Sequence, residues 1–305
     1  MPLQIKPYRV LYSLLCLLPL LSGSGAVVAN PDFDAIEVST RDMGRGLYLL
    51  TAAGGGNMLL STGDDGGLLV DDHLQQLGDK LLATISAVSD EPVRVLVNTH
   101  WHFDHTGNNG VLGDGGAVIM AHRNVRARLA DGQFVPAFNM TIPSAPPAAL
   151  PTVTYDDGLT LYWNGDTVDI RHMGAGHTDG DSVVYFGDAN IVHMGDLFWN
   201  GLYPLVDASS GGSTAGLIED VAAVLARIDE QTTVIPGHGE VGNKADLQAY
   251  HHMLQTVYTR IQALKAQGKT VEEIKAARPT AEFDAQWGAG LFAPDVWVSM
   301  LYLAP

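Results

Sequence analysis

Cysteine is almost absent from this chain of 305 residues, in which Cys16 is the only one. Cys16 lies in an apolar N-terminal segment that we predict to be removed, so the mature chain would hold no thiol and no disulfide. A chain without thiols suits an oxidising compartment. The same scarcity excludes cysteine as a ligand of any metal bound by the mature chain.

Basic residues are also scarce. The chain has 17 Lys and Arg residues against 34 Asp and Glu residues, and its formal net charge is −17. Proteins that bind nucleic acid or an anionic membrane surface need a basic face to attract the phosphates. We therefore expect neither kind of partner.

The N-terminus has an apolar run that is too short to span a bilayer comfortably. Lys6 and Arg9 precede the apolar residues 10–21, and small residues follow. This pattern predicts a secretory signal peptide over residues 1–29 and a single domain over residues 30–305. The mature protein would be secreted, into a periplasm, with no stable membrane association. An uncleaved N-terminal anchor is the alternative.

A cluster of histidines and one aspartate follows the apolar run 93–97, which is typical of a buried strand. The cluster reads His-x-His-x-Asp-His and comprises His100, His102, Asp104 and His105. Neutral imidazole and carboxylate are usual nitrogen and oxygen donors for Zn²⁺. The crowding of four such groups into one loop indicates a metal site.

Three later positions repeat this arrangement. His177, Asp196 and His238 each follow a strand-like run and lie close to glycine, which allows tight backbone turns near an ion. With the first cluster they give five histidines and two aspartates, enough for two metals about 3.5–4 Å apart. His73 and His122 also follow strand-like runs, but isolated histidines at such positions are more often structural.

The hydrophobic pattern predicts an α/β protein in which strands are followed by helices twice, giving two similar halves. In the first half, an amphipathic helix over residues 74–88 precedes the strand 93–97. In the second half, helices are expected over residues 214–228 and 244–267. Residues 134–151 are rich in proline and alanine, so they indicate a long ordered loop between the halves. That loop could cover the metals as a lid or pack on the core.

These motifs occur in an order that resembles the metallo-β-lactamase-fold superfamily of hydrolases, over residues 38 to 260 and including the run 68–71. The resemblance implies an αββα sandwich with two zinc ions at one edge between its sheets. It assigns the ligands as follows: His100, His102 and His177 to the first zinc, Asp104, His105 and His238 to the second, and Asp196 to both. Many true β-lactamases of this fold carry cysteine where Asp196 stands, so the resemblance predicts weak or promiscuous β-lactamase activity.

Residues around the ligands are expected to orient the imidazoles or to contact substrate. The resemblance gives Asp71 the role of bracing the loop that carries His100 to His105, called the metal loop below. Thr178, Asp181 and Ser182 are further candidates. The loop after Asp196 supplies three candidate substrate contacts, Trp199, Asn200 and Tyr203. A loop packed by its own aromatic residues is the alternative.

The resemblance implies a hydrolase acting on a small molecule through a metal-bridging hydroxide that Asp104 helps to orient. The preferred interpretation is opening of a cyclic amide, with a β-lactam as the best single substrate. Hydrolysis of a lactone, another ester or a thioester is the alternative. A mononuclear iron dioxygenase and a non-catalytic metal-binding module fit the complete ligand set less well. The ligands suit Fe and Mn as well as Zn²⁺, and the sequence leaves the oligomeric state open.

Overall fold

The computed structural model describes residues 32–304. The predicted signal peptide, residues 1–29, lies outside the described residues, so its prediction is not tested here. Within residues 32–304, no helix is both long enough and apolar enough to cross a membrane.

The first sheet has seven strands, in the order β1-β2-β3-β4-β5-β6-β9. Its first four strands pair antiparallel, and β4, β5, β6 and β9 pair in parallel. The strands are β1 (Ser39–Gly44), β2 (Leu47–Thr51), β3 (Met58–Ser61), β4 (Gly67–Val70), β5 (Val93–Val97), β6 (Val118–His122) and β9 (Val153–Tyr155).

The second sheet has six strands, in the order β10-β11-β12-β13-β14-β15. All neighbours pair antiparallel except β13 and β14, which are parallel. The strands are β10 (Gly158–Trp163), β11 (Asp166–Gly174), β12 (Asp181–Phe186), β13 (Ile191–His193), β14 (Thr233–Ile235) and β15 (Gly242–Asn243).

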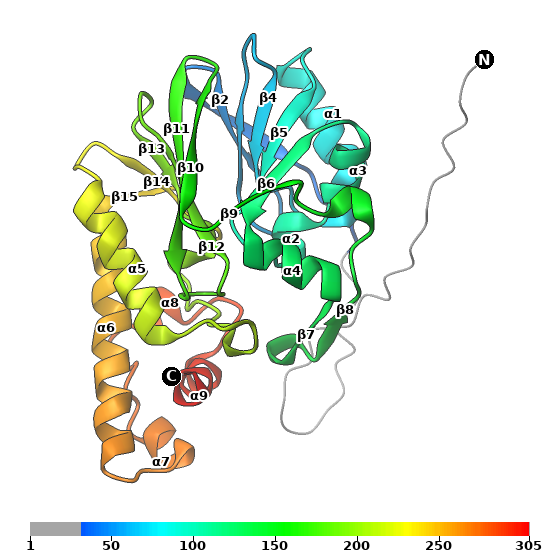
Figure 1. The fold of residues 1–305 in the computed structure, drawn as a ribbon. Coiled ribbons are helices and arrows are strands. Elements are labelled where there is room, and N and C mark those ends of the chain that lie inside the picture. The colour runs from blue at the N-terminus through cyan, green and yellow to red at the C-terminus, as the bar shows by residue number, and fades with distance from the viewer. Residues whose placement is uncertain (1–31, 305) are drawn as a thin grey trace.

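Helices cover the outer faces of both sheets, with α1 and α3 outside the first sheet and α5 and α6 outside the second (Figure 1). The α-helices are α1 (Gly78–Val88), α2 (Phe103–Thr106), α3 (Asn109–Asp114), α4 (Arg123–Asp131), α5 (Thr214–Arg227), α6 (Lys244–Ala266), α7 (Val271–Ala276), α8 (Asp284–Trp287) and α9 (Pro294–Leu303). Short 3₁₀ helices are η1 (Gln75–Leu77), η2 (Pro136–Phe138), η3 (Pro147–Ala149), η4 (Gly195–Leu197) and η5 (Ala208–Ser210). The predicted α/β class and αββα sandwich are confirmed.

The alternation of side chains along each strand divides the core into layers. On β4, Leu68 and Val70 face the cluster between the two sheets, while Leu69 faces the cluster under α1 and α3. On β12, Val184 faces the same inter-sheet cluster, and Val183 faces the cluster under α5 and α6. Strands buried on both faces read as continuous apolar runs, which is why the sequence predicted them.

Residues 134–151 differ from the long irregular loop that the sequence predicted. They include most of a small antiparallel hairpin of β7 (Gln133–Val135) and β8 (Met140–Ile142), connected through η2. Three-residue strands are too short to produce a clear alternation of apolar and polar residues. The hairpin pairs with neither large sheet.

Asn57, just before β3, joins the two halves of the sandwich through buried hydrogen bonds. Its side-chain amide donates to the carbonyl oxygens of Pro236 and Gly239, at 2.9 and 3.0 Å. Its backbone N–H donates to Gly237 O at 2.8 Å, and its carbonyl oxygen lies 3.0 Å from His193 Nε2. Asn57 therefore ties the first sheet to the loop after β14 that carries His238.

We expect Asn57→Ala to lower the free energy of unfolding by about 2 kcal/mol, because it leaves the buried Pro236 carbonyl oxygen without its donor and removes a second, part-buried bond to Gly239 O. Chemical denaturation with urea measures the change. Ser39→Ala serves as the control. Ser39 lies on the exposed strand β1, and its hydroxyl bonds to Thr51 on β2. Equal stability of the two variants would contradict a joining role for Asn57.

Candidate metal centre

The metal loop begins where β5 ends and is held in place by Asp71, just after the neighbouring strand β4. The Asp71 carboxylate accepts hydrogen bonds from Thr99 N and Thr99 Oγ1, both at 2.7 Å. It also accepts from His105 Nδ1 at 2.8 Å. One buried carboxylate therefore fixes both the start of the loop and the ring of a candidate ligand, as the sequence predicted for Asp71.

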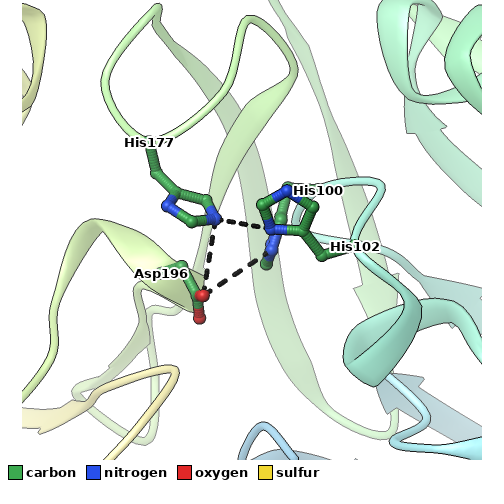
Figure 2. A group of neighbouring side chains, drawn as sticks. All are labelled: His100, His102, His177 and Asp196. Atoms are coloured by element: carbon green, nitrogen blue, oxygen red, sulfur yellow. Dashed lines mark hydrogen bonds and ion pairs between the residues drawn. The ribbon is translucent and has the colours of Figure 1, made fainter. Parts of the chain in front are cut away.

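Four candidate ligands gather into a first group, His100, His102, His177 and Asp196 (Figure 2). Each offers one donor atom, and these atoms lie within 4.8 Å of one another. His177 Nε2 lies 2.8 Å from His102 Nδ1 and 3.4 Å from Asp196 Oδ2. The group brings together the loops after β5, β11 and β13, which are far apart in the sequence.

A second group contains Asp104, His105 and His238, again with donor atoms within 4.8 Å of one another. His238 Nε2 lies 3.3 Å from Asp104 Oδ2. Asp196 belongs to the first group and also adjoins the second. Its Oδ1 is 3.1 Å from His105 Nε2, and its Oδ2 is 3.4 Å from His238 Nε2. All seven predicted ligands thus lie together at one edge of the sandwich.

The chemistry of these donors fits a metal. Three of the inward-facing atoms, His100 Nε2, His105 Nε2 and Asp196 Oδ1, are buried and have no hydrogen-bond partner among the described residues. A buried polar atom without a partner costs about 1–3 kcal/mol. A divalent cation would satisfy all three atoms, and imidazole and carboxylate are the ligands it prefers.

Histidine pKa values separate the two groups. Burial lowers the pKa of His100 well below its usual value and that of His177 to about 4, although Asp196 opposes both shifts. Burial acts in the same direction on His105 and His238, but there the carboxylates of Asp196 and Asp104 prevail. The pKa of His238 rises to about 9, and that of His105 rises well above its usual value.

The two carboxylates show the reciprocal effect. Burial alone would raise the pKa of Asp104 and of Asp196, but the surrounding imidazoles lower both well below the usual value. The site therefore pairs ionised carboxylates with protonated imidazoles of His105 and His238. A metal ion would replace those protons, so its affinity should fall as the pH is lowered.

The predicted supporting residues divide into one that touches an imidazole and three that do not. Asp71 holds His105, as described above. Asp181 accepts from the backbone N–H groups of His177 and Thr178 and from the Thr178 hydroxyl, so it shapes the loop and not the ring. Ser182 accepts from Tyr155 and donates its N–H to the Thr99 carbonyl. Thr178, Asp181 and Ser182 orient backbone, which corrects the prediction that they steer imidazoles.

Three contacts to imidazoles were missed from the sequence. Asp207 Oδ2 lies 3.0 Å from His102 Nε2, the Leu205 carbonyl oxygen lies 2.8 Å from His177 Nδ1, and Thr99 Oγ1 lies 3.0 Å from His100 Nδ1. Asp207 also caps η5, and a capping aspartate is too common to mark a function. A backbone carbonyl has no side-chain signal at all.

His73 and His122 lie outside both groups of candidate ligands. His73 is buried with its Nε2 at 3.2 Å from the Ala52 carbonyl oxygen, and burial lowers its pKa to about 4. The His122 ring stacks on His172, with ring centroids 3.8 Å apart. These placements agree with the structural role that the sequence favoured for both.

The three predicted substrate contacts lie in different surroundings. The Trp199 ring packs against His238, with centroids 4.3 Å apart. Asn200 donates to the Glu240 carbonyl oxygen at 2.7 Å. Tyr203 is fully buried, and its hydroxyl donates to Asp284 at 2.9 Å. Asn200 and Tyr203 therefore use these polar groups within the fold, and the Asn200 N–H donates to the His238 carbonyl oxygen at 2.9 Å. Of the three, Trp199 packs its ring against a candidate ligand, and the substrate contacts stay a prediction.

Glycine is needed where backbone approaches the candidate ligands. A Cβ at Gly56 would lie 2.1 Å from His105 Cε1, and one at Gly237 would lie 2.0 Å from Asp196 Oδ1. These separations are far below van der Waals contact. Any side chain at either position would displace a candidate ligand.

Comparison with known proteins gives a matching family model and a similar protein. Residues 47–238 match the family model described as the metallo-beta-lactamase superfamily. An uncharacterised protein of Aquifex aeolicus (strain VF5) is 29% identical over 154 residues, which cover 50% of this chain and 72% of that protein.

Solved structures share the fold at low sequence identity. A metallo-beta-lactamase from Pontibacter korlensis is 19% identical with a TM-score of 0.59, covering 72% of this chain and 99% of that chain. The stereoselective inverting sec-alkylsulfatase Pisa1 from Pseudomonas sp. is 16% identical with a TM-score of 0.66, covering 87% of this chain and 50% of that chain.

We expect Gly56→Ala to reduce the metal content of the purified protein, because the new methyl group would displace the His105 ring. Elemental analysis after dialysis against dilute Zn²⁺ measures it. Gly110→Ala is the matched control, since its Cβ would have only ordinary contact with Ala149 at 3.8 Å. Identical metal content in the two variants would contradict a ligand role for His105.

Proposed function

The chain belongs to the metallo-beta-lactamase superfamily, and from this membership we propose that it uses two zinc ions to hydrolyse a small cyclic amide, with a β-lactam as the first substrate class. The observation that carries the proposal is the position of Asp196. Its Oδ2 lies 3.4 Å from His177 Nε2 of the first group and 3.4 Å from His238 Nε2 of the second, so this one carboxylate adjoins both groups and would contact both ions. Members of this superfamily are hydrolases, and His/Asp clusters of this composition bind metals.

The donors would divide between the ions by proximity. His100, His102 and His177 would hold one ion. Asp104, His105 and His238 would hold the other, with Asp196 shared. When bound, such a pair of ions polarises a carbonyl group and lowers the pKa of a water molecule towards about 7.

The chain's own residues would then position the reactants. Asp104 is the candidate for orienting the attacking water, because its side chain is 15% exposed and the neighbouring imidazoles hold its pKa well below the usual value. His238 beside it is 17% exposed, whereas His100, His105 and His177 are almost completely buried. Substrate would therefore approach from the side of Asp104 and His238.

Hydrolysis of a sulfate ester is a second candidate. The likeness to the sec-alkylsulfatase covers 87% of this chain. That share is too large to be confined to residues 47–238, so it also includes parts of the chain outside the family match. The chain spans half of that sulfatase, and identity of 16% supports a shared fold and not a shared substrate.

Export to the periplasm is part of the proposal, supported by the sequence of residues 1–29 alone. Expression of the full chain in a bacterium with a periplasm should release a mature protein that begins at Asn30. N-terminal sequencing of the periplasmic fraction measures this. Retention of Met1 or recovery in the cytoplasm would contradict export.

The activity is tested by hydrolysis of a chromogenic cephalosporin by the mature, zinc-loaded protein, in parallel with a secondary alkyl sulfate. We expect cephalosporin turnover that falls by about 10²-fold or more in Asp104→Ala, since the water would lose its orienting carboxylate. Asp79→Ala on α1 is the control, because Asp79 is exposed and lies outside both groups.

The outcomes separate the candidates. Turnover of the cephalosporin that is lost in Asp104→Ala but retained in Asp79→Ala supports the β-lactam. Two bound zinc ions without cephalosporin turnover would overturn that substrate, and turnover of the sulfate would then favour the second candidate. Binding of fewer than two equivalents of zinc would contradict the shared role of Asp196.

A further inference from the structure

Aromatic rings form a continuous arc beside the open side of the candidate metal centre. The arc starts at His238, whose ring packs against Trp199 with centroids 4.3 Å apart. Trp199 packs against Phe292 at 6.2 Å, and Phe292 stacks on Phe138 at 6.3 Å. Phe138 then meets Phe103 edge to face at 6.5 Å. Offset and edge-to-face pairs at these distances are favourable.

Both ends of this arc lie at candidate ligands. His238 is itself a ligand, and Phe103 stands in the chain between His102 and Asp104. The arc therefore borders the side on which His238 and Asp104 are accessible. Trp199 and Phe292 are 4% and 5% exposed and form its inner layer. Phe103 and Phe138 are only partly buried, so part of their surface is open to solvent.

The three central rings of the arc come from separate segments. Phe138 ends η2 between β7 and β8, Trp199 follows η4, and Phe292 precedes α9. Figure 1 shows the β7–β8 hairpin at the same end of the molecule as α9. The hairpin pairs with neither large sheet, and Phe138 packs against both the cluster of α4 and β7 and the cluster that includes Phe292. Phe138 thus anchors the hairpin over this edge.

The three segments that carry Phe138, Trp199 and Phe292 hold no charged side chain. Residues 133–151, 197–206 and 285–294 contain no Asp, Glu, Lys or Arg. A substrate carboxylate is usually bound by Arg or Lys, and these segments offer neither. Apolar surface next to a reactive centre favours an apolar group of the substrate through burial.

We propose that Phe103 and Phe138 bind an uncharged aryl or alkyl group of the substrate, next to the bond that is cleaved. Phe138 is then a specificity-determining residue, with Phe292 and Trp199 fixing its position. The proposal rests on the proposed metal-dependent hydrolase, because it places this group beside the metal ligands. The substrate class is then molecules that carry a neutral apolar substituent next to the bond that is cleaved.

Binding of three hydroxamates to the mature, zinc-loaded protein tests the inference by calorimetry. Acetohydroxamate has a minimal tail, phenylacetohydroxamate an aryl tail, and succinohydroxamate an anionic tail, on one metal-binding head group. We expect the aryl ligand to bind roughly tenfold or more tightly than the minimal one, and the anionic ligand to gain nothing.

Phe138→Ala should remove most of the preference for the aryl tail, a change of roughly tenfold in the ratio of dissociation constants. Phe134→Ala is the matched control, because Phe134 lies on the same hairpin and is 51% exposed. Phe138→Leu keeps an apolar side chain at the anchor and should retain part of the preference, even if Phe138→Ala loosens the hairpin.

A preference for the aryl tail that is lost in Phe138→Ala and kept in Phe134→Ala supports the proposal. Equal affinity for the minimal and aryl ligands, tightest binding of the anionic ligand, or no binding to the zinc-loaded protein would each overturn it. Binding of a hydroxamate needs no bond cleavage. If the protein prefers the aryl tail but does not hydrolyse the cephalosporin, the result counts against the proposed β-lactam substrate and not against this inference.

Discussion

A carboxylate buried among imidazoles is the constraint on which the rest of the structure depends. Asp196 is 3% exposed and lies within 4 Å of ring nitrogens from four histidines. Burial of such a charge is costly unless positive charge compensates it. Protonated His105 and His238 supply that charge in the absence of a metal. The arrangement is therefore suited to hold cations, since ions would replace the protons at the same positions.

The sandwich satisfies this constraint by bringing loops of both sheets to one edge. Asp71 fixes the loop after β5 from the first sheet, and Asn57 fixes the loop after β14 from across the interface. Gly56 and Gly237 allow backbone to approach the ligands where no side chain would fit. The candidate ligands are positioned mainly by backbone and by buried hydrogen bonds.

The side chains around the candidate metal centre bear on its choice of substrate. The metal ligands determine that a bond is hydrolysed, while the partly exposed rings of Phe103 and Phe138 border the approach to them. Residues 133–151, 197–206 and 285–294, which carry Phe138, Trp199 and Phe292, hold no charged side chain, although the chain carries a net charge of −17. This uncharged surface is a local feature of an acidic protein. It favours substrates with an apolar group next to the candidate metal centre.

The sequence by itself determined the α/β class, the buried apolar strands such as β4 and β5, and the seven candidate ligands, because each rests on a local pattern. A short continuous apolar run indicates a buried strand, and His100 to His105 lie within six positions of one another. Only the tertiary structure decided that Asp207 holds His102 and that Tyr203 is buried. These contacts join residues about a hundred positions apart or depend on the packing of a whole layer, and such contacts leave no local signal.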